Sequence, residues 1–278
     1  MLERRPAWHA FMEVFTLLNR FEIWVPLILY LALKIILLAL YVASTGGPVL
    51  SFWELFLERG LREQLVHYPG HQLLMPTVFA RFNIVLDIFV HSFFQGVTIL
   101  LYAAAMQGRS LSFTMAFKLT LRRYLPLVGT TLIASSILFI CLDFMEHFLP
   151  RGGNVMFKTA NWGAIALAGL IIQAVFLFTG PSVLLSGRGV FGAIRESFVL
   201  AWGDFMQTII IVAVPFALAL PATLLELKSD TLAMRLSPDI LTHVQIFGEL
   251  LGFFSCLILV GGLTIAFIWR RADEDKRH

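Results

Sequence analysis

The chain has 278 residues, of which 58% are apolar and only 14% are charged. A mean hydropathy of +0.82 excludes an ordinary soluble domain, in which about 25% of residues are charged. The formal net charge is +3, but the lysine and arginine residues are spread among the loops between apolar stretches instead of forming one basic surface. This distribution argues against a nucleic-acid partner and indicates membrane orientation.

Six apolar stretches are long enough to cross a lipid bilayer, which needs about 20 residues of helix. They are residues 23–43, 84–106, 125–142, 163–186, 205–225 and 246–269. Each is expected to be helical, because a backbone exposed to lipid must satisfy its own hydrogen bonds. The sequence therefore predicts an all-α, polytopic transmembrane helix bundle, formed by a single integral membrane domain over residues 1–278.

An amphipathic helix is predicted just before the first span. Its apolar residues recur at helical spacing and are Trp8, Phe11, Met12, Phe15 and Leu18. Comparable stretches precede the third span, at 111–122, and the fifth, at 191–202. We interpret the pattern as three copies of one unit, in which a cytoplasmic interfacial helix is followed by a helical hairpin. The alternative is that any chain re-entering a membrane uses a basic amphipathic segment before the span.

The distribution of basic residues predicts the orientation. With six spans both termini lie on one side, and that side would hold nearly twice as many lysine and arginine residues as the other. The segment 107–124 carries Arg109, Lys118, Arg122 and Arg123 and no acidic residue. Because positive charge is retained on the inner side of a membrane, both termini are predicted to be cytoplasmic.

Ionisable and amide side chains inside the spans form a candidate polar cluster, since such groups are costly in hydrocarbon and need partners or water. Its members are Lys34, Asn83, Asp87, His91, Gln95, Gln173 and Glu249. In the second span, four of them recur every fourth residue and would share one stripe of the helix. Lys34 is expected to pair with Asp87 or Glu249, and Gln173 in the fourth span could extend the network.

Two interpretations of this cluster remain open. In the first, Asp87 and His91 bind a polar substrate or relay protons in an outward-opening cavity, with Lys34 as the counter-charge. In the second, the cluster only fixes the helix register or reaches toward the outer headgroups.

The remaining reactive residue types give little sign of chemistry. Cys141 and Cys256 both lie in apolar spans and are expected to act as small buried side chains. His67 and His71 flank a Pro-Gly pair, which argues against two metal ligands on one helix. The sequence contains no HExxH, GxSxG or Walker A motif. We therefore predict a protein that is not an enzyme, with no catalytic residue, no cofactor and no metal.

The stretch PSVLLSGRGVFGAIRESFVLAWGDFMQTIII, beginning at Pro181, supports a family resemblance. A proline-containing span end is followed by a glycine turn, then a helix with Ala193 and Ser197, and then an aromatic corner. This arrangement resembles the signature segment of a bacterial six-span family that includes YciC-like proteins and the membrane portion of some glycerophosphoryl diester phosphodiesterases. The resemblance implies an integral protein of the bacterial inner membrane and transfers no catalytic residue.

A second, weaker likeness concerns residues 196–203 followed by Pro215. This segment is similar to the loop through which ABC permeases contact their ATPase, but it lacks the alanines expected after Glu196.

Three functions follow as expectations. The first is a non-enzymatic component of envelope transport or membrane homeostasis. The second is a permease for a small solute or lipid, either a secondary transporter or an ATPase-coupled subunit. The third is a structural or assembly scaffold. The expected partners are membrane lipids, with other membrane proteins or a cytoplasmic ATPase as possible additions.

Overall fold

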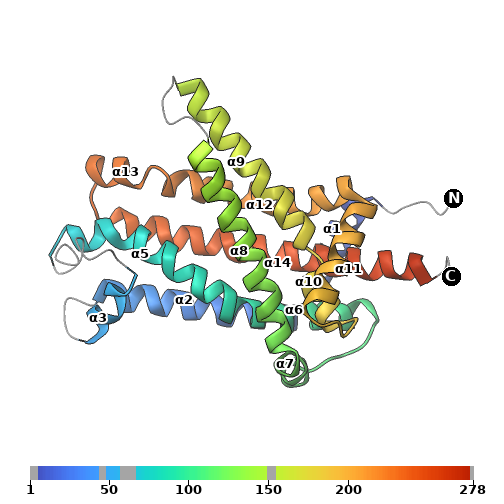
Figure 1. Ribbon diagram of the computed structural model, residues 1–278. Helices are drawn as coiled ribbons and strands as arrows, with labels where there is room; N and C mark the ends of the chain where they lie inside the picture. The colour runs from blue at the N-terminus through green and yellow to red at the C-terminus, as the bar shows by residue number, and fades with distance from the viewer. Residues whose placement is uncertain (1–5, 44–47, 57–66, 149–154, 276–278) are drawn as a thin grey trace. The chain divides into compact units, whose positions relative to one another are not determined.

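The computed structural model describes residues 6–43, 48–56, 67–148 and 155–275. Every regular element in these ranges is helical, which confirms the all-α prediction (Figure 1). The elements are α1 (Ala7–Leu17), η1 (Phe21–Ile23), α2 (Val25–Ala43), α3 (Pro48–Glu54), α5 (Gly70–Leu86), η3 (Asp87–His91), α6 (Ser92–Met106), α7 (Phe113–Arg122), α8 (Tyr124–Phe148), α9 (Val155–Phe176), α10 (Thr179–Leu184), α11 (Val190–Gly203), α12 (Phe205–Glu226), α13 (Ser229–Arg235) and α14 (Ile240–Asp275).

Within the described ranges, six helical stretches are long and apolar enough to span a membrane. They are Val25–Ala43, Gly70–Met106, Tyr124–Met145, Gly163–Leu184, Phe205–Glu226 and Ile240–Asp273. The number matches the six predicted spans, and the protein is an integral membrane protein.

The second span begins at Gly70, well before the predicted start at residue 84. The polar residues of this added segment lower its mean hydropathy, so hydropathy alone did not place it in the span. The protein supplies hydrogen-bond partners for two of these residues. His71 and Gln72 are both only 8% exposed. The ring Nε2 of His71 lies 2.9 Å from the carbonyl of Tyr41, and the hydroxyl of Thr242 donates to Oε1 of Gln72 at 3.2 Å. The sixth span likewise begins earlier than predicted, at Ile240 instead of residue 246.

The contacts of the chain separate into two compact units. The first unit comprises residues 1–24, 92–214 and 258–278, and the second comprises residues 25–91 and 215–257. Each unit is therefore assembled from segments that are distant in the sequence, and α12 and α14 each contribute residues to both.

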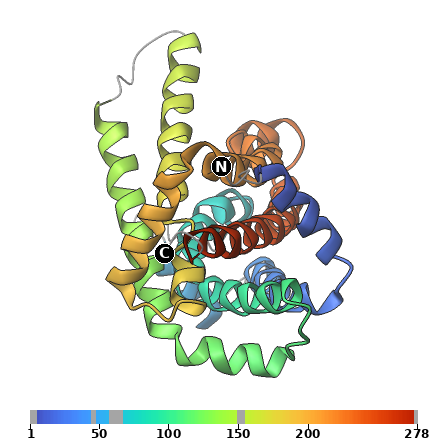
Figure 2. The same cartoon turned by 90° about the vertical axis from the view of Figure 1, so that its right-hand side faces the viewer.

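The first unit contains the helical hairpin of α8 and α9, which lie side by side in Figures 1 and 2. Helices α10 and α11 pack against it, and a small core forms from Leu127, Val183 and Ala193. At the corner between α11 and α12, the guanidinium of Arg270 donates to the carbonyl of Leu200 at 2.7 Å and to the hydroxyl of Thr208 at 2.9 Å. Arg270 thereby fixes the end of α14 in this unit.

A break between α9 and α10 interrupts the fourth span at residues 177–178. Pro181 lacks a backbone N–H and its ring crowds the preceding turn, which ends the regular helix there. The hydroxyl of Ser197 in α11 bridges the break, because it accepts from the N–H of Phe178 at 3.0 Å and donates to the carbonyl of Val175 at 2.7 Å. Ser197 and its neighbour Ala193 are fully buried, so the two signature residues have a structural role in this chain.

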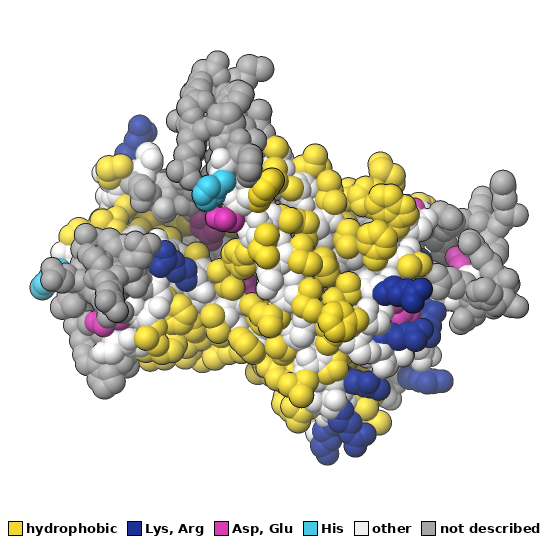
Figure 3. All heavy atoms as spheres, in the orientation of Figure 1, with side chains coloured by type: hydrophobic (Ala, Val, Ile, Leu, Met, Phe, Trp, Pro, Cys, Tyr) yellow, Lys and Arg dark blue, Asp and Glu magenta, His cyan; other side chains and the backbone are white. Residues whose placement is uncertain are grey.

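Helices α1, α7 and α11 lie at the three positions where an amphipathic segment is predicted. In α1, Trp8 and Phe15 are exposed, whereas Phe11 is buried with Val14 on another face. The predicted apolar stripe is therefore divided between the protein interior and the surface. In the first unit, lysine and arginine side chains gather over α7 and the α10–α11 segment (Figure 3). The interfacial position of these helices and the threefold repeat of the hairpin stay predictions.

The second unit holds the candidate polar cluster, and an aromatic group lies in the same unit. The ring of Tyr41 stacks on His71 at 4.3 Å, and its hydroxyl donates to the backbone carbonyl of His71 at 2.7 Å. Trp53 of α3 is 1% exposed and contacts Tyr41 and Phe79. His71 therefore packs among aromatic rings as part of the core of this unit.

Candidate functional site

The turn Asp87–His91, η3, carries the two central residues of the polar cluster. It is a π-helical turn inserted between α5 and α6. Such a turn contains more residues than an α-helical turn, so side chains that follow it no longer continue the stripe of those before it. Asn83, Asp87 and His91 all belong to the second unit, whereas Gln95 belongs to the first. The place of Gln95 on this stripe stays a prediction.

An ion pair joins α2 to α14 in the second unit. Nζ of Lys34 lies 2.8 Å from Oε2 of Glu249, and the two side chains are only 12% and 9% exposed. Of the two partners expected for Lys34, the structure selects Glu249. Two opposite charges that are both largely removed from solvent stabilise each other strongly only if their remaining hydrogen-bonding atoms are also satisfied.

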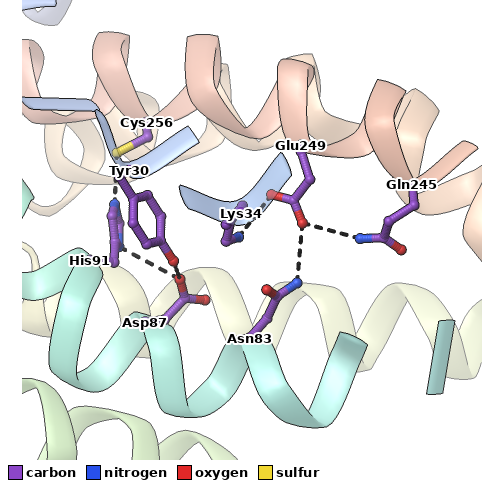
Figure 4. A network of polar contacts seen from close by, with 8 residues as sticks. All are labelled: Tyr30, Lys34, Asn83, Asp87, His91, Gln245, Glu249 and Cys256. Carbon is purple, nitrogen blue, oxygen red and sulfur yellow. Dashed lines mark hydrogen bonds and ion pairs between the residues drawn. The ribbon is translucent and has the colours of Figure 1, made fainter. Parts of the chain in front are cut away.

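The carboxylate of Glu249 meets that condition. Its Oε1 accepts from Nδ2 of Asn83 at 3.2 Å and from Nε2 of Gln245 at 3.1 Å, while its Oε2 accepts from Lys34 (Figure 4). Three donors from three helices therefore converge on one carboxylate. This half of the cluster is closed and charge-balanced.

The other half is centred on Asp87 and is more open. The hydroxyl of Tyr30 donates to Oδ1 of Asp87 at 2.6 Å, and Nδ1 of His91 lies 4.0 Å from the same oxygen, beyond hydrogen-bonding distance. The Asp87 side chain is 50% exposed and that of His91 is 24% exposed. Asp87 therefore has one close donor, where Glu249 has three.

His91 is held in place from both sides. Its Nε2 lies 3.1 Å from the sulfur of Cys256, and its ring stacks on Tyr30 with a centroid distance of 5.0 Å. Because a carboxylate lies on the Nδ1 side, we assign the proton of the neutral ring to Nδ1, and the thiol of Cys256 then donates to Nε2. This assignment orients an N–H bond toward Asp87.

A cavity of about 210 Å³ lies within the second unit, between the two halves of the cluster. Its lining residues are Leu27, Tyr30, Leu31, Lys34, Asp87, His91, Glu249, Gly252, Phe253 and Cys256. Gly252 keeps this space free, since a Cβ built there would meet no atom within 4 Å. By contrast, a Cβ at Gly248 would lie 2.7 Å from Oε1 of Glu226, so Gly248 serves the close packing of α14 against α12.

The sequence-predicted cluster is thus brought together in part. Lys34, Asn83, Asp87, His91 and Glu249 converge in the second unit. Gln95 and Gln173 belong to the first unit, where the side chain of Gln173 is exposed on α9. Their place in the network stays a prediction.

Three members of the network were missed by sequence reasoning. Tyr30 lies one helical turn before Lys34, and Gln245 lies one turn before Glu249. A search for polar residues at helical spacing around each buried charge would have found both. Cys256 was interpreted as an inert apolar side chain, and only its contact with His91 reveals a polar role.

The arrangement can bind a polar solute, because it presents donors and acceptors to one cavity. Among the residues that the structure describes, no group of three or more His, Cys, Asp or Glu side chains could hold a metal ion. Comparisons with protein-family models, with curated proteins and with solved structures find no match to this chain. Its function must therefore be argued from the site.

Proposed function

We propose that this protein is a permease for a small polar solute, which binds in the cavity of the second unit. The observation that supports the proposal is that a cavity lies among helices of the membrane-spanning part and that two carboxylates, an imidazole and an ammonium group are among its lining groups. Ionisable groups at membrane depth are characteristic of substrate and ion pathways, because their cost in hydrocarbon is otherwise hard to justify. A cluster that served only to fix the helix register would need no such cavity.

The volume of the cavity limits the solute. The cavity measures about 210 Å³. Sites for drug-sized ligands measure about 300 to 1,000 Å³. A phospholipid is too large for this space, so the proposed solute has only a few non-hydrogen atoms.

We further propose that the protein works in a bacterial inner membrane with both termini in the cytoplasm, as the resemblance and the distribution of basic residues suggest. The gathering of lysine and arginine side chains over α7 and the α10–α11 segment of the first unit supports this orientation (Figure 3). A tag at either terminus should then be inaccessible to a non-permeant reagent on intact cells.

The proposed transport does not require coupling to an ATPase through Glu196. This residue lies in the segment that is similar to the contact loop of ABC permeases. Its carboxylate accepts from the hydroxyl of Ser186 at 3.2 Å and lies 3.5 Å from both Arg188 and Arg271. Because these contacts hold Glu196 within the first unit, we favour a permease without an ATPase and without enzymatic activity.

Uptake by the purified full-length protein in phosphatidylethanolamine–phosphatidylglycerol vesicles tests the proposal. The probes are urea, guanidinium and nitrate, three planar molecules of nearly equal size and different charge. We expect at least one probe to enter faster than into protein-free vesicles. His91→Ala and Lys34→Met should abolish that uptake.

A pair of glycine substitutions provides the matched control. Gly252→Leu places a side chain in the cavity and should block uptake, whereas Gly169→Leu makes the same change in α9 of the first unit, where a Cβ also meets no atom within 4 Å. Equal uptake in the two variants would contradict the permease proposal. Well-folded protein with no uptake of any probe would favour the scaffold function, in which the closed Lys34–Glu249 half only fixes the helices.

A further inference from the structure

The charges around the cavity do not balance unless a cation is added. Lys34 and Glu249 neutralise each other at 2.8 Å. With His91 in its neutral form, the carboxylate of Asp87 remains as one uncompensated negative charge. An isolated carboxylate is costly where little water is present, and a nearby cation removes much of that cost.

The hydrogen bonds show the same imbalance. Glu249 accepts from three donors, whereas among the described residues of this network only the hydroxyl of Tyr30 lies within hydrogen-bonding distance of Asp87. One turn away, Oδ1 of Asn83 is buried and has no hydrogen-bond partner among the described atoms. Figure 4 shows this oxygen on the side of Asn83 that faces Asp87. Asp87 thus has fewer donors than a buried carboxylate such as Glu249, and it lies where the cavity gives access to it.

The walls of the cavity also suit a cation. The ring of Tyr30 already lies 5.1 Å from the ammonium of Lys34, which demonstrates a cation–π geometry at this position. Phe253 supplies a second aromatic side chain to the lining. Aromatic faces carry partial negative charge, so they attract cations and not anions.

We infer that the solute of the proposed permease is a small cation that donates hydrogen bonds, such as an ammonium or guanidinium compound, and that it binds against Asp87 in the cavity. This inference rests on the proposed function and specifies its substrate class. The cation would supply the positive charge that Asp87 lacks and further donors to its carboxylate. Its N–H groups would face the carboxylate oxygens, as in carboxylate–guanidinium pairs.

The test compares the three planar probes in wild-type vesicles. Guanidinium carries a permanent positive charge and several N–H donors, urea has similar donors and no charge, and nitrate is an anion without donors. We expect guanidinium to enter faster than urea and nitrate to be excluded. This comparison needs no variant, so it remains decisive even if a substituted protein fails to fold.

Substitution of Asp87 then tests the role of its charge. Asp87→Asn keeps the shape and can still accept from Tyr30, but it removes the charge. The ratio of guanidinium to urea uptake should fall about tenfold or more, since a hydrogen bond to a charged group contributes about 1.5 to 3 kcal/mol and each 1.4 kcal/mol is a factor of ten. Asp87→Glu retains the charge and should retain most of the preference for guanidinium.

The outcomes separate this inference from the proposed function. Faster uptake of urea or nitrate than of guanidinium, or an unchanged ratio in Asp87→Asn, would overturn the cation inference and leave the permease standing. If all three probes enter wild-type vesicles no faster than Gly252→Leu vesicles, the permease proposal and the cation inference are both overturned.

Discussion

Removal of the Lys34 ammonium should destabilise the protein through the charge that it leaves behind. In Lys34→Met, Glu249 stays 9% exposed and keeps only its amide donors, Asn83 and Gln245. Removing one partner of a buried ion pair costs about 3 to 5 kcal/mol of stability in soluble proteins. Interhelical hydrogen bonds in membranes contribute about 0.6 kcal/mol on average and at most about 1.7, because the unfolded chain also finds partners there. We therefore expect a loss of about 2 to 3 kcal/mol.

A double-mutant cycle isolates the contribution of the pair. Glu249→Gln alone leaves the ammonium of Lys34 without its carboxylate and should cost a similar amount. The double variant leaves neither charge behind, so it should cost less than the two single changes added together, with a coupling energy of about 1 to 3 kcal/mol. Unfolding of the purified protein in mixed micelles, followed by circular dichroism, measures all three values. Lys118→Met, at an exposed position of α7, is the control and should change stability by less than about 0.5 kcal/mol.

Two results would refute this reasoning. A cost below about 0.5 kcal/mol for Lys34→Met would mean that the pair behaves like an exposed surface ion pair, for which that value is typical. Strict additivity in the cycle would mean that Lys34 and Glu249 act independently, which their separation of 2.8 Å does not allow.

Two further predictions concern the first unit. Ser197→Ala leaves the buried N–H of Phe178 without its acceptor and should lower the free energy of unfolding by about 1 to 3 kcal/mol in the same assay. Ser197→Thr restores a hydroxyl and should recover part of this loss. Gly261→Ala should cost about 1 to 3 kcal/mol, because its Cβ would lie 2.9 Å from the ring of Tyr102, whereas the same change at Gly262 meets its nearest atom at 3.4 Å and should be nearly neutral. Equal stability of the two glycine variants would contradict the packing argument.

The membrane class and the number of spans could be predicted because both depend on composition averaged over about 20 residues. The residues at which the spans begin could not be predicted as well. The segment 70–83 contains buried polar residues, such as His71 and Gln72, whose cost is removed by specific partners and not by apolar character. A hydropathy average has no information about such partners.

The candidate site could be predicted as a set of costly side chains and not as a network. Helical spacing correctly associated Asn83, Asp87 and His91, but the π-helical turn over Asp87–His91 could not be predicted from the spacing of these residues. The choice of Glu249 over Asp87 as the partner of Lys34 depends on how α2, α5 and α14 pack, which spacing along a single helix cannot reveal.

The division of the cluster into a closed and an open half has a consequence for binding. A site is specific when its groups are held in place before the ligand arrives, since ordering them afterwards would weaken binding. Glu249 ties Lys34, Asn83 and Gln245 together, and so the helices beside the open half are held in place before a solute arrives. Loss of the Lys34–Glu249 pair should therefore abolish solute uptake as well as lower stability, because both residues line the cavity that the pair holds in shape.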